Sequence, residues 1–167
     1  MIRRARPDDV DFLVELYADP DVRPFLAGGH DFGRESVAAD VERAERDPDA
    51  FGVFLIEVDG DRAGAMGFER TNARSRIARL GALAVHPRFR GRRLADGAAR
   101  ELVSHLLLEA GFHRLELEIY GFNERAVAHA ERAGFVQEGI KRLAYRQDDG
   151  WVDGLLYAIV REDLDAE

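Results

Sequence analysis

Two apolar runs joined by the dipeptide Asp59-Gly60 occupy the middle of this sequence and constrain its fold more than any other feature. The first run covers residues 51–58 and the second covers residues 63–68. An Asp-Gly connection between two such runs is typical of a β-hairpin. A third apolar run, residues 77–85, stops before Pro87 and predicts another strand. The middle of the chain is therefore expected to form a sheet.

Apolar residues at helical spacing lie on both sides of this sheet region. They predict a helix that begins at Pro7 and another that is capped by Ser36 and ends before Pro48. A longer helix is expected over residues 91–110, with Gly111 as its stop. The remaining expected elements are strands at residues 2–6 and 115–120, a loop at 25–33 containing Gly28-Gly29, a helix at 124–133, a strand opening at 134–136, and a final hairpin with arms at 143–145 and 151–160. This order predicts one mixed α/β domain over residues 1–167.

The composition is that of an ordinary globular protein, with 46% apolar and 34% charged residues. A net charge of -8 disfavours general nucleic-acid binding, and no stretch approaches the roughly 18 consecutive apolar residues of a membrane helix. The absence of cysteine excludes disulfides, thiolate nucleophiles and Cys-ligated metals. Only Lys141 is a lysine among the 24 basic residues, a bias that we attribute to genome composition. We expect a cytoplasmic protein that binds neither nucleic acid nor membranes.

The segment from Val85 to Ala95 combines a strand end, a glycine turn and the start of a helix. Four arginines lie within residues 88–93 of an otherwise acidic chain. Free N–H groups and the positive dipole end at a helix N-terminus favour phosphate, and guanidinium groups suit phosphate oxygens. The spacing matches neither a Walker loop nor a Rossmann fingerprint. The segment fits a pyrophosphate-bearing cofactor, although a solvated basic turn would account for the charges alone.

Residues 90–95 resemble the R/Q-x-x-G-x-G/A acetyl-CoA motif of the GNAT superfamily of N-acetyltransferases. Residues 123–135 resemble its N-x-x-A … G-F segment. The ending, Glu138-Gly139 followed by residues 150–153, resembles the branch of ribosomal-protein N-terminal and spermidine acetyltransferases. The resemblance implies a mixed, mostly antiparallel sheet of about seven strands flanked by helices. It also implies acetyl-CoA as co-substrate, with no metal, and transfer of its acetyl group to a primary amine by direct attack.

The resemblance assigns cofactor contacts to three segments. These are the strand backbone at Leu83, Ala84 and Val85 for the pantetheine arm, the turn residues Arg90, Gly91, Arg92, Arg93, Leu94 and Ala95 for the pyrophosphate, and Asn123 for a polar contact with the cofactor arm or substrate. Asn123 is also explained as a helix cap. Arg93 occupies a glycine position of the motif, and a requirement there for a glycine-only backbone would weaken cofactor binding.

The strand at 115–120 alternates strictly, so Glu116, Glu118 and Tyr120 share one face. Leu117-Glu118-Ile119 resembles the L-E-V-R strand of N-terminal acetyltransferases, whose glutamate is a proposed base, and Glu118 is our candidate for the catalytic base. A solvated acidic face is the alternative interpretation of the same pattern.

Two groups expected from the resemblance are absent. Leu80 stands where many relatives carry a glutamate, and Ala130 replaces the family's tyrosine acid, while the neighbouring His129 is expected to point elsewhere on the helix. These replacements leave open a catalytically inactive domain that binds or senses acyl-CoA.

The acceptor remains open among a protein N-terminus, a polyamine, an aminoglycoside and other small amines. The aromatic residues that fit either the wall of an acceptor pocket or the core and rim are Phe25, Phe32, Tyr145 and Trp151. A homodimer is compatible with the family resemblance.

Overall fold

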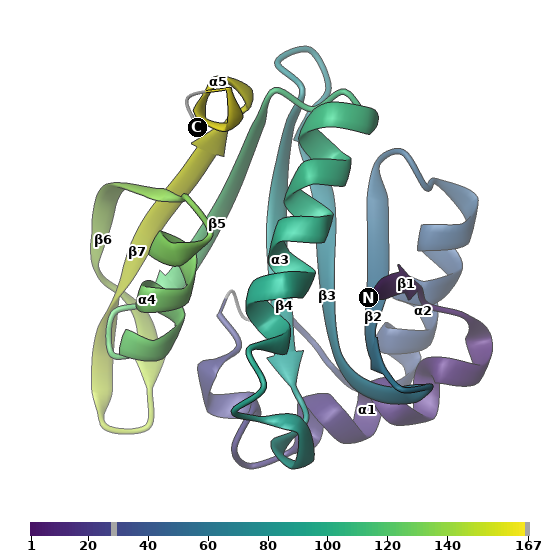
Figure 1. Ribbon diagram of the computed structural model, residues 1–167. Helices are drawn as coiled ribbons and strands as arrows, with labels where there is room; N and C mark the ends of the chain where they lie inside the picture. The colour runs from purple at the N-terminus through teal and green to yellow at the C-terminus, as the bar shows by residue number, and fades with distance from the viewer. Residues whose placement is uncertain (28–29, 166–167) are drawn as a thin grey trace.

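A strongly bent sheet forms the centre of the computed structural model, which describes residues 1–27 and 30–165 (Figure 1). Within these residues the sheet has seven strands in the order β1-β2-β3-β4-β5-β7-β6. The strands are β1 (Ile2–Arg4), β2 (Phe51–Val58), β3 (Asp61–Asn72), β4 (Ile77–Val85), β5 (Arg114–Tyr120), β6 (Val136–Gln147) and β7 (Gly150–Val160). Neighbours pair antiparallel except β4 and β5, which run parallel. The expected fold class is therefore confirmed.

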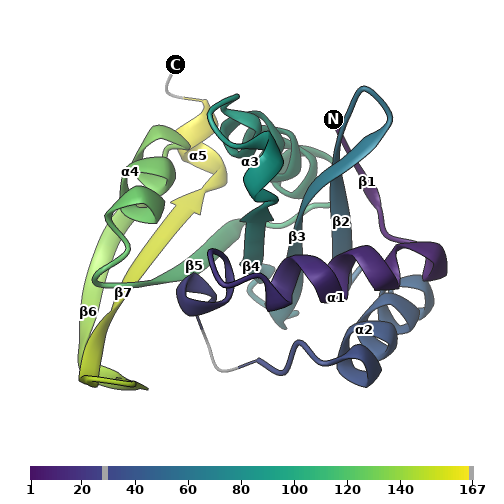
Figure 2. The ribbon, with the colours of Figure 1, turned by 90° about the horizontal axis from the view of Figure 1, so that it is seen from below.

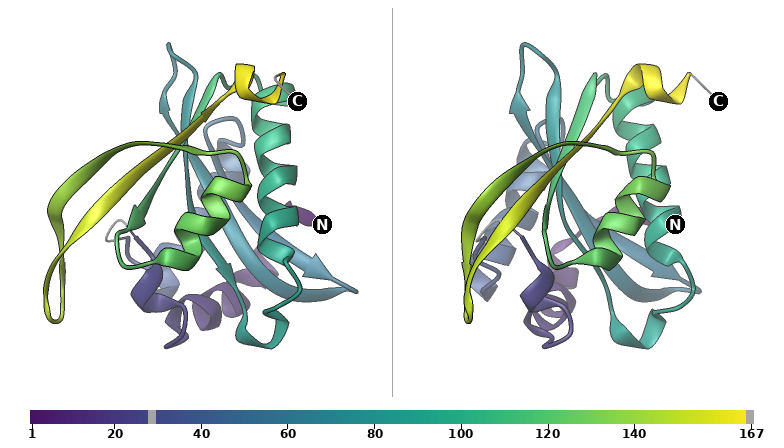
Figure 3. Two further views of the ribbon diagram at one scale, coloured as in Figure 1. Left: turned by 60° about the vertical axis from the view of Figure 1, so that its left-hand side comes forward. Right: turned by 90° about the vertical axis from the view of Figure 1, so that its left-hand side faces the viewer.

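The Asp59-Gly60 turn joins β2 to β3 as expected. Both residues have positive φ, 52° and 84°, which is the backbone conformation of a two-residue turn that matches the right-handed twist of the flanking strands. A second tight connection, at residues 148–149, joins β6 to β7. β6 is longer than expected, because residues 136 and 143–145 belong to one strand with two register shifts. Figure 3 shows this hairpin extending away from the helices.

Helices cover both faces of the sheet (Figure 2). One face carries α1 (Val10–Ala18) and α2 (Arg34–Arg46), and the other carries α3 (Leu94–Ser104) and α4 (Glu124–Arg132). Short turns complete the set: 3-10 turns at Pro7–Asp9, Arg23–Phe25 and Pro87–Phe89, a π turn at His105–Glu109 and the C-terminal α5 (Arg161–Leu164). None of the helices in the described part of the chain is long and apolar enough to cross a membrane.

Two helix starts differ from the sequence prediction. Ser36 lies inside α2, whose N-cap is Gly33, because a turn made by Asp31 Oδ1 with the Gly33 amide begins the helix earlier. The helix expected from residue 91 begins only at Leu94, since Arg93 has a left-handed backbone. Gly111, with φ 79°, follows the end of this helix as predicted. The Gly28-Gly29 part of the expected loop lies outside the described residues.

The two faces of the sheet bury separate cores. Leu102, Leu106 and Leu115 are fully buried between the sheet and the helices α3 and α4. Leu13, Leu16 and Leu55 are fully buried beneath α1 and α2. This division follows from the alternation of side chains along each strand, which sends successive residues of β2, β3 and β4 to opposite cores. Because helices pack on both faces, the backbone N–H and C=O groups inside the sheet can be reached by a ligand only where two strands separate.

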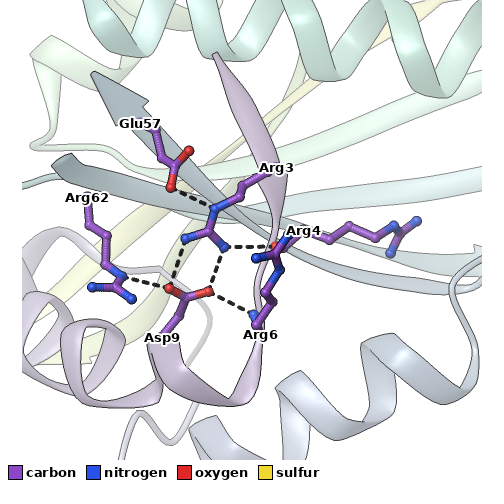
Figure 4. Close-up of polar contacts among 6 residues, drawn as sticks. All are labelled: Arg3, Arg4, Arg6, Asp9, Glu57 and Arg62. Atoms are coloured by element: carbon purple, nitrogen blue, oxygen red, sulfur yellow. Dashed lines mark hydrogen bonds and ion pairs between the residues drawn. The ribbon is translucent and has the colours of Figure 1, made fainter. Parts of the chain in front are cut away.

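A buried carboxylate ties the N-terminal segment to the sheet (Figure 4). The Asp9 side chain is 1% exposed and accepts hydrogen bonds from both terminal nitrogens of Arg3 at 2.7 and 3.0 Å, from Arg62 Nε at 2.7 Å, and from the Arg6 amide at 2.8 Å. Arg3 Nε also donates to Glu57 at 2.7 Å. Burial by itself would raise the pKa of Asp9, but the hydrogen bonds from Arg3 and Arg62 hold it well below its usual range.

Candidate active site

β4 and β5 separate along their length and open a cavity through the sheet. They pair only where Ile77–Arg79 meets Arg114–Glu116, and beyond these residues the strands diverge (Figure 1). The cavity has a volume of about 810 Å³ and is lined by both strands, the start of α3, α4 and the segment after α1. Leu117 faces the α3–α4 core, while Glu118, its neighbour in the strand, points to the opposite face. The cavity therefore connects the two sides of the sheet.

The β4 side of this cavity contains the predicted backbone segment. Leu83, Ala84 and Val85 all line it. Ala84 and Val85 pair with β3 on their other side, so the edge of β4 that faces β5 has no ladder partner there among the described residues. Backbone N–H and C=O groups at such an edge can pair with an extended ligand. The geometry thus suits a flexible chain that carries amide groups.

The glycine turn closes one end of the cavity. Of the predicted turn residues, Arg90, Gly91, Arg93, Leu94 and Ala95 line the cavity. Arg92 does not line it in the described structure, and its guanidinium lies 5.8 Å from the centre of the Phe89 ring. Arg90 also contacts the segment after α1. Its terminal nitrogen donates a hydrogen bond to the Asp21 carbonyl at 2.9 Å and so fixes that segment.

Left-handed backbone at two positions shapes this turn. Gly91 has φ 82°, and Arg93, the N-cap of α3, has φ 54° and ψ 29°. The family motif has glycine at the second of these positions, and the structure shows why, because this conformation is costly for a residue with a Cβ. The first amides of α3 follow directly, and such amides have no partner within their own helix. The turn therefore offers N–H groups to an anion despite the substitution.

An ion-paired cluster joins the first turn of α3 to α4. Asp96 accepts hydrogen bonds from His129 Nδ1 at 2.6 Å and from Arg132 at 3.1 and 3.2 Å. The hydrogen bonds from Arg132 and His129 lower the pKa of Asp96. The Arg132 cation and the hydrogen bond with His129 compensate the carboxylate, which would otherwise repel an anion at the helix start. His129 contacts Asp96 at the start of α3 and lines the cavity, as does Ala130, whose side chain is 1% exposed.

Asn123 caps α4. Its Oδ1 accepts a hydrogen bond from the Ala126 amide at 3.1 Å, so the predicted helix cap is confirmed. The residue also lines the cavity, as does Phe122 before it. The cap fixes the point at which the chain leaves β5 and enters α4, and thereby holds this side of the cavity open.

Glu118 is held from the C-terminal hairpin. Its side chain is 11% exposed and lines the cavity. Tyr145 donates its hydroxyl to Oε1 at 2.5 Å, and the Lys141 ammonium lies 3.1 Å from Oε2. The hydrogen bond from Lys141 to Glu118 raises the pKa of Lys141, and burial together with the bond to Glu118 raises the pKa of Tyr145. Lys141 is thus kept as a cation and Tyr145 as an O–H donor.

Gly154 makes room for this carboxylate. A Cβ at this position would overlap Glu118 Oε1 and lie 2.7 Å from the Tyr145 ring. Glu116, two residues before Glu118, instead pairs with Arg114 at 2.9 Å. The two carboxylates of β5 are therefore held by different cations, and only Glu118 reaches the large cavity. The sequence pattern did not indicate Lys141 or Gly154, because both act on Glu118 across strands.

The aromatic candidates have separate places. Phe25 lines the cavity and lies 5.9 Å from Phe122, ring centre to ring centre. Phe32 packs against Tyr17 at 4.6 Å, next to the core under α1 and α2. Trp151 is 60% exposed. Among residues 1–27 and 30–165, no group of three or more His, Asp and Glu side chains has the spacing of metal ligands.

Comparison with known proteins gives consistent results. Residues 1–136 match the family model of the acetyltransferase (GNAT) domain. The sequence is 25% identical over 173 residues to the putative ribosomal N-acetyltransferase YdaF of Bacillus subtilis, an alignment that covers 99% of this chain and 93% of that protein.

Solved structures share the fold. The spermidine N-acetyltransferase of Vibrio cholerae in complex with CoA and spermine has a TM-score of 0.86 at 16% identity, covering 98% of this chain and 96% of that one. A structure described as a probable acetyltransferase has a TM-score of 0.80 at 23% identity, covering 97% and 93%. At these sequence identities, the similarity to the two solved structures shows a shared fold.

Proposed function

Since the chain belongs to the GNAT acetyltransferase family, we propose that it transfers the acetyl group of acetyl-CoA to a primary amine that attacks the thioester directly. One observation carries this proposal: a single cavity reaches from the helix start at Leu94 to the carboxylate of Glu118. The first feature suits a pyrophosphate and the second suits an amine. The divergence of β4 and β5 brings both to one site.

The cofactor's chemistry fits the residues present. The unpaired edge of β4 at Leu83 to Val85 would pair with the amide groups of the pantetheine arm, and the amides of the α3 turn would hold the pyrophosphate. Arg90 and Arg93 add positive charge at the same end. Acetyl-CoA supplies the activated carbonyl, and the protein supplies position and a proton acceptor.

Glu118 acts as the base in this proposal. An amine is nucleophilic only after it loses its proton, and a carboxylate within hydrogen-bond reach can accept that proton directly or through water. The Tyr145 hydroxyl and the Lys141 ammonium hold this carboxylate in one position. Preorganisation of this kind lowers the cost of placing the amine against the carbonyl.

The leaving thiolate has no dedicated acid at the family's tyrosine position, which is the buried Ala130. We propose that solvent in the cavity supplies the proton. The acceptor belongs to the class of small primary amines or protein N-termini. The polyamine in the complex of the Vibrio cholerae relative, and the ribosomal assignment of the Bacillus subtilis relative, support testing both.

A panel of amines tests the proposal. The protein is incubated with acetyl-CoA and polyamines, aminoglycosides or N-terminal peptides, and the released thiol is measured. Glu118→Gln should lower kcat by about 10²–10⁴-fold, the usual contribution of a general base, and should change acetyl-CoA affinity little. Glu116→Gln is the matched control, because Glu116 shares the face and charge but pairs with Arg114.

Three outcomes contradict the proposal in different ways. Acetyl-CoA binding without turnover of any amine would favour the inactive acyl-CoA-binding domain, which the replacements at Leu80 and Ala130 motivate. A melting temperature that does not rise with saturating acetyl-CoA would contradict cofactor binding itself. Equal losses of kcat in the Glu118 and Glu116 variants would remove Glu118 as the base.

A further inference from the structure

We propose that Lys141 is a self-acetylation site, at which the protein transfers one acetyl group from acetyl-CoA to the Nζ atom of its own lysine. The inference rests on the proposed function, because it uses the same base and the same acetyl donor. It concerns an amine that belongs to the chain itself. Lys141 is the only lysine in the sequence, so Nζ of this residue is the only side-chain primary amine of the protein.

The geometry places the Lys141 amine at the candidate base. Its Nζ lies 3.1 Å from Glu118 Oε2, within direct hydrogen-bond distance. An acceptor amine that uses Glu118 must come to the same carboxylate, so the Lys141 ammonium occupies a position that an external amine would take. Glu118 in turn lines the cavity that contains Leu83 and the α3 turn. Lys141 is therefore in direct contact with a residue that lines the candidate active site.

Lys141 has the freedom that the reaction needs. It lies on β6, opposite Gly154 of β7, and its side chain is 45% exposed. The ion pair with Glu118 positions the Lys141 ammonium, while the exposed stem of the side chain leaves room for that group to move. Gly154 has no side chain between the two strands. The flexible four-carbon stem of lysine allows Nζ to change position without movement of the strand.

The reaction balances with acetyl-CoA as the only co-reactant. Glu118 takes a proton from the Lys141 ammonium, and the neutral Nζ attacks the acetyl carbon. A C–N bond forms, the C–S bond breaks, and the electron pair leaves with the CoA sulfur. The second proton lost from nitrogen and the proton on Glu118 pass to the thiolate and to solvent, which gives CoA thiol and acetyl-lysine. The ion pair keeps Lys141 protonated and so makes this reaction slow relative to that of a free acceptor.

Acetylation would alter the site that performs it. The product amide is neutral, so the ion pair with Glu118 is lost while the hydrogen bond from the Tyr145 hydroxyl remains. The place of the ammonium group at Glu118 would then be open to an external amine. Because an amide nitrogen is not nucleophilic, the modification is expected to end after one acetyl group at this residue.

The chain contains its own control for the experiment. The amino group of Met1 is 87% exposed and lies 4.0 Å from Glu101, far from the site in the sheet order. Both amines meet the same acetyl-CoA in solution, so uncatalysed acetylation reaches both. Purified protein is incubated with isotope-labelled acetyl-CoA without an acceptor. Mass spectrometry of the intact chain and of its peptides then gives the rate at each amine.

We expect Lys141 to be labelled at least about tenfold faster than Met1, and Glu118→Gln to slow Lys141 labelling by about 10²-fold or more without changing the Met1 rate. Glu116→Gln should leave both rates unchanged. Lys141→Arg should abolish the internal label, and because arginine also pairs with Glu118 it keeps the charge of the site. The rate constant at Lys141 should not depend on protein concentration, since the reaction is intramolecular.

Three results would overturn the inference: labelling of Lys141 no faster than that of Met1, an unchanged Lys141 rate in Glu118→Gln, or a rate constant that rises with protein concentration. Melting curves with and without acetyl-CoA show that each variant is folded and binds the donor. A parallel amine panel separates the two proposals. Turnover of external amines with no label on Lys141 refutes self-acetylation alone.

Discussion

Replacing Arg93 with glycine measures the backbone cost of the departure from the family motif. Arg93 caps α3 with φ 54° and ψ 29°, a left-handed conformation that costs an L-residue about 1–2 kcal/mol. Glycine does not carry this cost, but its greater conformational freedom in the unfolded chain lowers the free energy of unfolding by about 0.5–1 kcal/mol. The Arg93 side chain is exposed and makes no hydrogen bond or ion pair with other described residues, so little contact energy is lost.

The net effect is that Arg93→Gly should have a free energy of unfolding about 1 kcal/mol, or slightly less, above that of the parent. Arg92→Gly is the matched control, because Arg92 is also exposed, carries the same charge and lacks a positive φ. At position 92 glycine relieves no backbone strain, and we expect the free energy of unfolding to fall by about 0.5–1 kcal/mol. The two variants should therefore differ by about 1–2 kcal/mol in the free energy of unfolding, or roughly 2–8 °C in melting temperature for a chain of this size.

Thermal and urea unfolding without cofactor tests this difference directly. A second measurement, the rise in melting temperature with CoA, reports the lost guanidinium separately, and it should be smaller for Arg93→Gly than for the parent. If Arg93→Gly unfolds at the same temperature as Arg92→Gly or below it, the left-handed backbone carries no strain. Position 93 would then have no energetic preference for glycine.

Three further substitutions test other parts of the fold and site. Asp9→Asn should reduce the free energy of unfolding by about 2–4 kcal/mol at neutral pH, because it removes the buried carboxylate that pairs with both Arg3 and Arg62. Since the pKa of Asp9 is depressed, its contribution is complete above about pH 4 and is lost as the pH falls below that value, so the parent and variant stability curves should converge in acid. Curves that stay parallel to low pH would contradict this. Asn123→Ala should cost about 1 kcal/mol through the lost cap, whereas Asn123→Asp should keep most of it, as urea unfolding can show. Gly154→Ala should displace the Glu118 carboxylate and lower kcat at least about tenfold with unchanged acetyl-CoA affinity, while Gly139→Ala, with room for a Cβ, should not. Equal kcat values in these two variants would show that Gly154 does not position Glu118.

Local patterns in the sequence predicted most of the elements. The Asp59-Gly60 turn and the strand at residues 77–85 follow from interactions between neighbours in the chain, and the structure has both at the predicted positions. The Asn123 cap was predicted for the same reason. The family motif then indicated the cofactor end of the site, because its backbone turn and its arginines are contiguous in sequence.

Contacts between distant segments decided the rest. The cavity exists because β4 and β5 pair over only three residues each, and no pattern within either strand specifies where their pairing stops. Ser36 was the wrong helix cap because Asp31 and Gly33 begin α2 earlier. Arg93 was seen as a departure from the motif, but its left-handed backbone, and hence the later start of α3, depends on how the turn packs.

Glu118 shows this division most clearly. Strand alternation in the sequence determined which face of β5 it occupies and separated it from Leu117 and Ile119. Only the tertiary structure brought Tyr145 and Lys141 to its two oxygens and placed Gly154 beneath it, since these residues are 23–36 positions away along the chain. Side-chain direction within a strand is a local property of the backbone. The partners of a carboxylate depend on which strands lie next to it, and that is settled by burial of the whole sheet.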